Sequence, residues 1–256
     1  MFPIRDHNPS QSTPVVVFAL IAINVAVFLY DLVAVQSTAE LSRFYARYAL
    51  VPAFISQGEG LTGIVTHMFL HGGIMHLAGN MLFLWVFGDN LEDEMGHVGF
   101  LLFYLASGFA AGFAQYIGAP FSQVPMVGAS GAIAGVMGGY LLLFPKAKID
   151  VFIFLIIIIR IIPVPAWIML LIWFGLQVIN GVSADLYAGG TAYWAHAGGF
   201  VAGLALTVPL WLRLGAQAFW ERSHGHPPHP EAQYSFKRTS VPTVQRRPRR
   251  RGPWGR

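Results

Sequence analysis

Four polar side chains interrupt otherwise apolar stretches of this 256-residue sequence, at His76, Asn80, Ser130 and His196. A polar group inside a hydrophobic membrane costs free energy unless it is paired, so each of the four is a candidate functional residue. A serine becomes a nucleophile when a histidine accepts its proton. We therefore predict acyl-transfer chemistry, with Ser130 as the nucleophile and His196 as the base.

The residues around Ser130 suit a negative charge that develops on oxygen. Ser130 lies in Gly128-Ala129-Ser130-Gly131, where a loop is predicted to enter a helix. The first N–H groups of a helix have no hydrogen-bond partner within the helix, and they lie at the positive end of its dipole. They can therefore stabilise an oxyanion that forms beside them. The flanking glycines let a substrate backbone come close. His76 and Asn80 are four residues apart, hence on one helix face, and we predict that both donate to the same oxyanion.

No carboxylate is expected beside the two catalytic candidates. Asp185 precedes His196 in a loop, so the sequence predicts a serine–histidine dyad and no acidic third member. The alternative is a metal site built from His67, His71, His76 and His196. Metal sites in helical bundles usually add carboxylates, and none is predicted at this level. We therefore expect neither a metal nor a cofactor.

The composition identifies the setting as a membrane. Hydrophobic residues make up 55% of the chain and charged residues only 11%, whereas a soluble domain carries roughly 25% charged residues. Cysteine is absent. Disulfides, thiolate metal sites and a cysteine nucleophile are therefore excluded.

Six apolar stretches carry these residues, and we interpret them as membrane-spanning helices. They are residues 14–34, 74–87, 98–117, 127–144, 163–181 and 192–212. Glycines recur at spacings of four in several of them, as at Gly131 and Gly135 or Gly199 and Gly203, which is typical of closely packed membrane helices. The predicted fold is an all-α membrane protein, a six-helix bundle with a basic, disordered C-terminal tail.

The depth of the candidate residues favours a common site. At 1.5 Å per residue, Ser130 lies about 21 Å, His196 about 24 Å and His76 about 20 Å from the cytoplasmic ends of their helices. All three thus fall in the outer third of a hydrocarbon core about 30 Å thick. Three different helices therefore bring polar side chains to one level.

Residues 149–162 do not fit the helical pattern. The stretch is rich in isoleucine, is interrupted by Arg160, and is separated from the next helix by Pro163 and Pro165. It is too short to cross a bilayer alone, so we expect an interfacial or re-entrant segment.

Lys and Arg are concentrated after residue 221, among many prolines. We interpret 1–13 as a cytoplasmic N-terminal segment, 14–212 as the membrane domain and 213–256 as a basic, Pro-rich cytoplasmic tail. A tail of this kind can bind nucleic acid, but a solvated cytoplasmic anchor fits the positive-inside rule better, and no nucleic-acid partner is expected. Six spans place both termini on the cytoplasmic side, and we expect a prokaryotic inner membrane.

Three motifs resemble the rhomboid family of intramembrane serine proteases. They are His76-Leu-Ala-Gly-Asn80, Gly128-Ala-Ser130-Gly131 and Ala195-His196-Ala-Gly198-Gly199-Phe-Val-Ala-Gly203, in the family's order. The resemblance covers about residues 14–212. It implies a six-helix bundle with a cavity open to the outside, in which Ser130 and His196 cleave single-span membrane proteins near the outer membrane face. It also implies an oxyanion region formed by His76 and Asn80, to which we add Gly128 and, near the end of the third span, Gln115.

One departure from the family concerns the histidine. Some members stack a tyrosine, one turn after the serine, against the catalytic histidine, and this chain has Ala134 there. The candidates for holding the His196 ring in place are Trp194 or a contact with a small residue.

Two other functions stay open: a catalytically inactive binder or transporter on the same bundle, and a metal-dependent membrane hydrolase. The sequence leaves the oligomeric state open.

Overall fold

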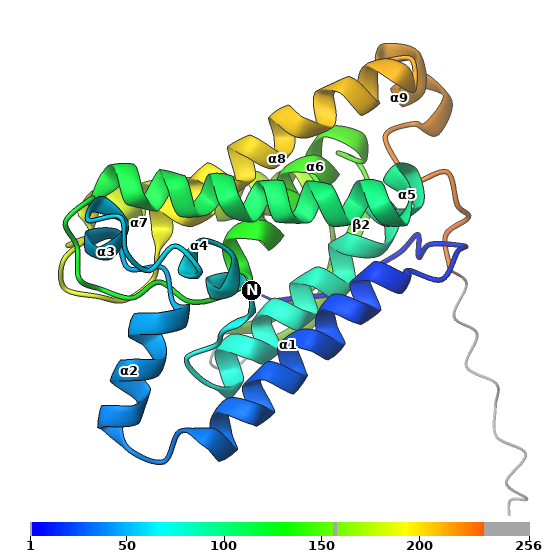
Figure 1. Ribbon diagram of the computed structural model, residues 1–256. Coiled ribbons are helices and arrows are strands. Elements are labelled where there is room, and N and C mark those ends of the chain that lie inside the picture. The colour runs from blue at the N-terminus through cyan, green and yellow to red at the C-terminus, as the bar shows by residue number, and fades with distance from the viewer. Residues whose placement is uncertain (1, 156–157, 233–256) are drawn as a thin grey trace, which may run out of the picture.

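The computed structural model describes residues 2–155 and 158–232, and most of them are helical (Figure 1). The elements in chain order are β1 (Phe2–Asp6), α1 (Val15–Ala34), α2 (Thr38–Tyr48), α3 (Pro52–Ser56), α4 (Gly63–Thr66), the 3₁₀ turn η1 (His67–Phe69), α5 (Ile74–Gly118), α6 (Ser130–Leu143), β2 (Lys148–Leu155), β3 (Ile158–Pro165), α7 (Ala166–Ser183), α8 (Tyr193–Arg213) and α9 (Gln217–Ser223).

The six apolar stretches all contain helix, but two of them form one long element. Helix α5 runs through both the second and the third stretch, and its backbone leaves the helical region at Gly96, where φ is 70° and ψ is 162°. Only glycine adopts such a positive φ readily. Figure 1 shows the consequence: α5 has two limbs that run in different directions, the first of them beside α1.

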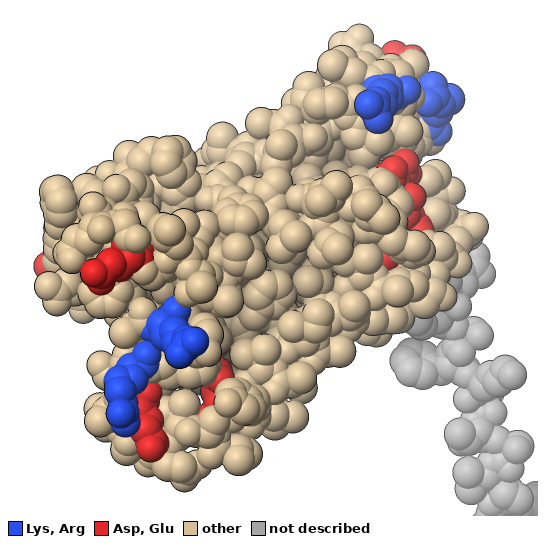
Figure 2. Space-filling view, viewed as in Figure 1, with Lys and Arg blue, Asp and Glu red and all other residues tan. Residues whose placement is uncertain are grey.

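By length and composition, four of the described helices could cross a membrane, namely α1, α5, α7 and α8. Helix α6 is apolar but has only 14 residues, about 21 Å of helix, which is less than the roughly 30 Å of a hydrocarbon core. On the face drawn in Figure 2, charged side chains lie toward the ends of the molecule and the middle lacks them. These features describe a mostly helical membrane protein.

Helix α6 is the centre of the bundle and packs against both α5 and α8. The approach of α6 to α8 depends on two pairs of glycines. A methyl group added at Gly199 would overlap the carbonyl oxygen of Gly131, and one added at Gly203 would overlap that of Gly135. The predicted packing role of these glycines is therefore confirmed, and it brings the helix that begins with Ser130 against the helix that carries His196.

Residues 149–155 and 158–162 belong to a β-sheet, a secondary structure that the expectation of an interfacial or re-entrant segment did not include. Strands β2 and β3 pair antiparallel, with Val151 opposite Ile162, and β1 from the N-terminus joins the free edge of β2. The run of β-branched residues explains the local preference for strand. The all-α prediction is thus wrong at this end of the molecule, and the N-terminal segment is part of the fold.

At the end of the bundle beside β1, two buried carboxylates accept hydrogen bonds from other residues. Tyr140 and Asn90 both donate hydrogen bonds to the buried Asp6 carboxylate, Asn90 at 2.7 Å. Glu92, which is 1% exposed, accepts hydrogen bonds from the backbone N–H groups of Val16 and Val17 at 2.8 and 2.9 Å. It therefore caps the N-terminus of α1, where unpaired N–H groups favour a negative charge.

The beginning of the predicted disordered tail is structured. Helix α9 places the Trp220 indole N–H 2.9 Å from the carbonyl oxygen of Leu142. Farther along, the N–H of Ala232 donates to the carbonyl oxygen of His7 at 2.8 Å. The expectation of disorder is therefore wrong for residues 214–232. Residues 233–256, which hold most of the basic side chains, lie outside the described part of the chain.

Candidate active site

Ser130 is the first residue of α6, as its position after a glycine-containing loop predicted. The loop is held by the N–H of Gly128, which donates to the carbonyl oxygen of His67 at 2.9 Å. Gly128 has a φ of 130°, and a methyl group there would lie 2.8 Å from the His76 ring and 3.5 Å from the Ser130 hydroxyl oxygen. Glycine is required for both reasons: the backbone conformation and the space that His76 and Ser130 occupy.

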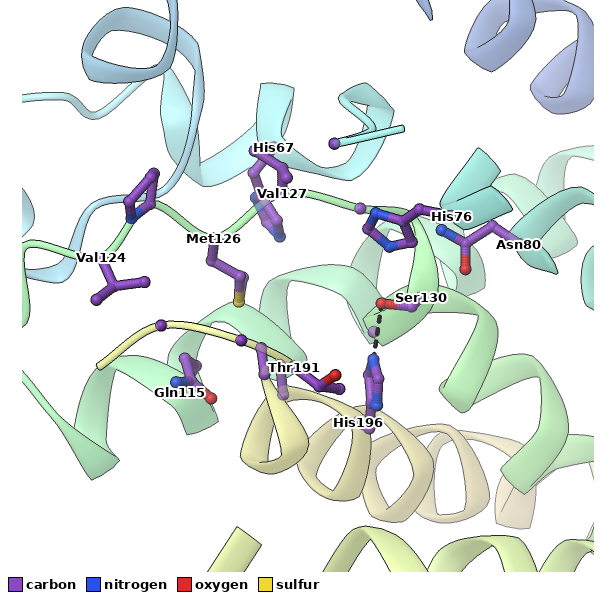
Figure 3. Close-up of a pocket in the computed structure, with 18 of the residues that line it drawn as sticks. His67, His76, Asn80, Gln115, Val124, Met126, Val127, Ser130, Thr191 and His196 are labelled. Atoms are coloured by element: carbon purple, nitrogen blue, oxygen red, sulfur yellow. Dashed lines mark hydrogen bonds between the residues drawn. The ribbon is translucent and has the colours of Figure 1, made fainter. Parts of the chain in front are cut away.

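The serine and histidine side chains meet directly. The distance from Ser130 Oγ to His196 Nε2 is 2.8 Å, which is hydrogen-bond distance for a nucleophile and its base. His196 lies in the first turn of α8, and the glycine contacts described above set the short distance between α6 and α8. Figure 3 shows this bond between the two helices.

His76 and Asn80 extend from the first limb of α5 toward the same place. In Figure 3 the Ser130 hydroxyl lies between the His196 ring and the side chains of His76 and Asn80. Asn80 is 7% exposed, yet its side-chain Nδ2 has no hydrogen-bond partner among the described residues. A buried amide donor without a partner is costly, so it is available to an oxygen that a substrate brings.

A single cavity of about 550 Å³ connects the predicted residues. It is lined by His76, Asn80, Gln115, Gly128, Ser130 and His196, together with part of the 184–192 connection. Gln115 lies away from Ser130 in Figure 3, and its side-chain oxygen is buried without a partner among the described residues. All six residues expected from the sequence thus border one space.

The sequence analysis missed Gln177. Its Oε1 lies 2.9 Å from His196 Nδ1, on the side of the ring opposite Ser130. The indole of Trp173, one turn earlier on α7, lies against the same ring at a centroid distance of 5.8 Å. Trp194, the candidate considered for this role, packs instead beside Gly181. The signal was present, because Gln177 is a polar residue within an apolar span, the criterion that identified His76 and Asn80.

The other histidines near the site have separate contacts. The His67 ring is buried and its Nδ1 lies 2.8 Å from the carbonyl oxygen of Gly63. The His71 ring packs edge-on against His76, with centroids 5.2 Å apart. Within residues 2–155 and 158–232, no three His, Asp or Glu side chains are grouped so that they could hold a metal ion. The site is thus built from a hydroxyl, imidazoles and amides.

Comparison with known proteins identifies the family of the chain. A family model described as Rhomboid domain matches residues 58–213. Rhomboid protein 1, mitochondrial, of Saccharomyces cerevisiae is 33% identical over 197 residues, which are 73% of this chain and 51% of the yeast protein. Rhomboid protease GluP of Bacillus subtilis is 44% identical over 89 residues, 35% of this chain and 17% of that protein. Putative rhomboid protease YdcA of the same bacterium is 40% identical over 78 residues, 30% of this chain and 39% of that protein.

The chain spans about half the length of the yeast relative and less of the two bacterial ones. Because these relatives include a mitochondrial protein as well as bacterial ones, they give the expected prokaryotic inner membrane no support of their own. The family match and the apolar helices do make the protein an integral membrane protein. The family model covers most of the chain, including the helices that carry Ser130 and His196, so the chain belongs to the rhomboid family.

Proposed function

We propose that this protein is an intramembrane serine endopeptidase that uses Ser130 and His196. The observation that carries the proposal is the 2.8 Å contact between Ser130 Oγ and His196 Nε2, inside a cavity that also holds an amide donor, Asn80 Nδ2, without a partner among the described residues. Two bacterial relatives whose names include rhomboid protease support the same activity.

The reaction follows from the positions of the donors and acceptors. His196 Nε2 accepts the hydroxyl proton as Ser130 attacks the peptide carbonyl carbon, and it then protonates the departing amine. The developing oxyanion is held by the backbone N–H of Ser130 with the side chains of His76 and Asn80. A water molecule then hydrolyses the acyl-enzyme, with His196 again acting as base. Gly128 leaves room for the substrate backbone, and Gln115 borders the more distant part of the cavity.

The substrates are single-span membrane proteins cut near the outer face of the bilayer. The support is the position of Ser130 at the start of a helix of 14 residues, about 21 Å from its other end. The 184–192 connection lines the cavity and contains Gly189 and Gly190, both with positive φ. Substrate enters beside this connection and α7. Both termini lie on the cytoplasmic side. The terminal segments 1–13 and 213–256, which flank the membrane domain of residues 14–212, therefore lie there too.

Reconstitution with a single-span substrate tests the activity. The wild-type protein in vesicles should cleave the substrate, and a fluorophosphonate should label it. Ser130→Ala should lose both cleavage and labelling while eluting as the same folded species. Cleavage that persists in Ser130→Ala would refute the nucleophile. A folded wild-type protein with neither cleavage nor labelling would instead identify the inactive binder or transporter.

A further inference from the structure

Gln177 is the described side chain that contacts the far nitrogen of the candidate base. Its amide oxygen lies 2.9 Å from His196 Nδ1, and the residue is 9% exposed. We infer that Gln177 is a positioning residue: it holds the His196 ring in the one orientation and tautomer in which Nε2 can accept the Ser130 proton. This inference rests on the proposed function, and it replaces the expected dyad by a chain of three side chains.

The direction of the amide follows from its second contact. The other end of the Gln177 amide, Nε2, lies 3.3 Å from the backbone carbonyl oxygen of Trp173. A carbonyl oxygen only accepts hydrogen bonds, so it selects the NH₂ group of the amide and leaves Oε1 facing His196. An amide oxygen also only accepts, and therefore His196 Nδ1 must carry the hydrogen. In a neutral imidazole the other nitrogen, Nε2, then has the free lone pair that faces Ser130.

A neutral amide suits this location better than a carboxylate does. The histidine and the glutamine lie between α7 and α8, two helices with the length and composition of membrane spans. An unpaired carboxylate there would cost more than an amide. An amide orients the ring without holding a negative charge beside it, so it stabilises the charged imidazolium less than a carboxylate would. Gln177 thus acts mainly on geometry and tautomer.

The test compares Gln177→Leu, which keeps the approximate volume but removes the acceptor, with Gln177→Glu, which restores an acceptor and adds charge. We expect Gln177→Leu to lower kcat by about 10- to 100-fold, by analogy with the loss of groups that orient metal-bound histidines. KM should change little, since Gln177 contacts the base and not the substrate. Leu176→Ala is the matched control, because the neighbouring Leu176 is 50% exposed on the outer face of α7.

The pH profile separates positioning from a merely structural role. In Gln177→Glu the carboxylate stabilises the protonated ring, so the rise of kcat/KM with pH should move to higher pH while kcat at its plateau exceeds that of Gln177→Leu. Wild-type kcat and an unchanged profile in both variants would overturn the inference. So would equal losses in both that match a fall in thermal stability. A wild-type protein without Ser130-dependent cleavage would refute the proposed function itself, which is a separate result.

A second, independent observation concerns a cavity on the side of the 35–73 connection. It has a volume of about 650 Å³ and lies between the C-terminal half of α1 and α2. Its apolar wall includes Ile23, Val27, Val35, Phe69 and Leu70, and its charged wall consists of Asp31, Glu40, Arg43 and Arg47. In Figure 2 positive and negative side chains lie around a hollow at the lower left.

The wall of this cavity changes character along α1. Ile23 and Asp31 both line it, and they are about 12 Å apart along the helix axis. The same distance in a bilayer leads from the hydrocarbon region to the headgroups. A ligand that matches both parts has an apolar chain and a charged head, as a phospholipid does. Lipid is also the molecule that surrounds an exposed membrane helix.

The charges specify the headgroup. One carboxylate oxygen of Asp31, Oδ1, is buried without a partner among the described residues and so requires a hydrogen-bond donor. Arg43 and Arg47, both exposed and on one face of α2, suit a phosphate. We propose that this cavity binds a phospholipid whose head combines a phosphate with a primary ammonium group, as in phosphatidylethanolamine. Phosphatidylcholine has the same charges but no N–H to donate.

Native mass spectrometry of protein released from vesicles tests this site. Vesicles contain equal amounts of phosphatidylethanolamine, phosphatidylcholine and phosphatidylglycerol. We expect retention of phosphatidylethanolamine, lowered about 10-fold or more by Asp31→Asn or by Arg43→Ala with Arg47→Ala, the scale of a lost charged hydrogen bond. Glu59→Gln, an exposed acidic position outside the cavity, is the control. Equal retention of the three lipids, preference for phosphatidylglycerol, or retention unaffected by the variants would each overturn the proposal.

Discussion

The buried carboxylates at one end of this bundle and the side-chain amides around Ser130 differ in their hydrogen bonding. Near β1, the carboxylates of Asp6 and Glu92 accept hydrogen bonds from other parts of the protein. Around Ser130, by contrast, Asn80 Nδ2 and Gln115 Oε1 are buried without a partner among the described residues. Leaving such groups unpaired costs free energy. The two carboxylates thus contribute hydrogen bonds to the fold, while the two amides around Ser130 keep hydrogen-bonding atoms that no described residue uses.

The largest effect that tests this contrast is a loss of kcat on replacing Asn80. Asn80→Ala should lower kcat by about 10²- to 10³-fold, the usual loss for one oxyanion donor. The melting temperature should stay the same or rise, because a buried amide without a partner is removed. A reconstituted cleavage assay and a thermal melt of the same preparation measure both. A stable variant with wild-type kcat would show that Asn80 does not contact the oxyanion.

The next effect concerns the glycine contact that brings together the helices carrying Ser130 and His196. Gly199→Ala forces a methyl group onto the Gly131 carbonyl, an overpacking that costs about 1–3 kcal/mol. Both the thermal stability and the cleavage rate should fall, because Ser130 and His196 move apart. Gly175→Ala on α7 is the matched control, since a methyl group there meets nothing within 4 Å. Equal effects of the two substitutions would contradict the packing role.

A smaller effect, on stability, is expected from replacing Glu92 near β1. Glu92→Gln leaves one good acceptor for the two N–H groups of Val16 and Val17, and a lost helix cap costs about 1 kcal/mol. Thermal stability should fall while kcat of the folded enzyme is unchanged. Glu221→Gln at an exposed site on α9 serves as the control. A loss of kcat without a loss of stability would mean that the two ends are not separate in role.

The smallest effect is a pH dependence at Asp6. Burial raises the pKa of Asp6 from 3.8 to about 7. The folded protein therefore keeps a proton that the unfolded chain releases above about pH 4, so the free energy of unfolding falls as the pH rises from about 4 to 7. Asp6→Asn should flatten this part of the curve of melting temperature against pH. An unchanged slope would show that Asp6 is ionised in the folded protein throughout this range.

The candidate site was largely predictable because its signals are local. A serine that opens a helix after a glycine loop, and two donors four residues apart, follow from short segments read by themselves. The polar character of Gln177 was equally visible, but its partner was not. Contact between α7 and α8 depends on how the two helices are rotated about their axes and how closely they pack, and neither is contained in the spacing of either segment.

The sheet and the structured part of the tail illustrate the same limit. The isoleucine-rich stretch 149–162 favours strand, but the contact of β1 with β2 joins Arg5 to Asp150 across 145 positions of sequence. The position of α9 similarly depends on the Leu142 carbonyl that Trp220 meets. Such pairings depend on where the intervening helices place their ends, and composition alone favoured disorder for the tail.

The sequence alone was enough to predict a membrane protein and to single out candidate residues for the chemistry, because an unpaired polar group within an apolar span costs free energy. The folded arrangement was needed to show which groups meet. It alone joined Gln177 to His196, closed one end of the bundle with a sheet, and left Asn80 Nδ2 without a partner among the described residues, because these outcomes depend on the relative placement of helices that are distant in sequence.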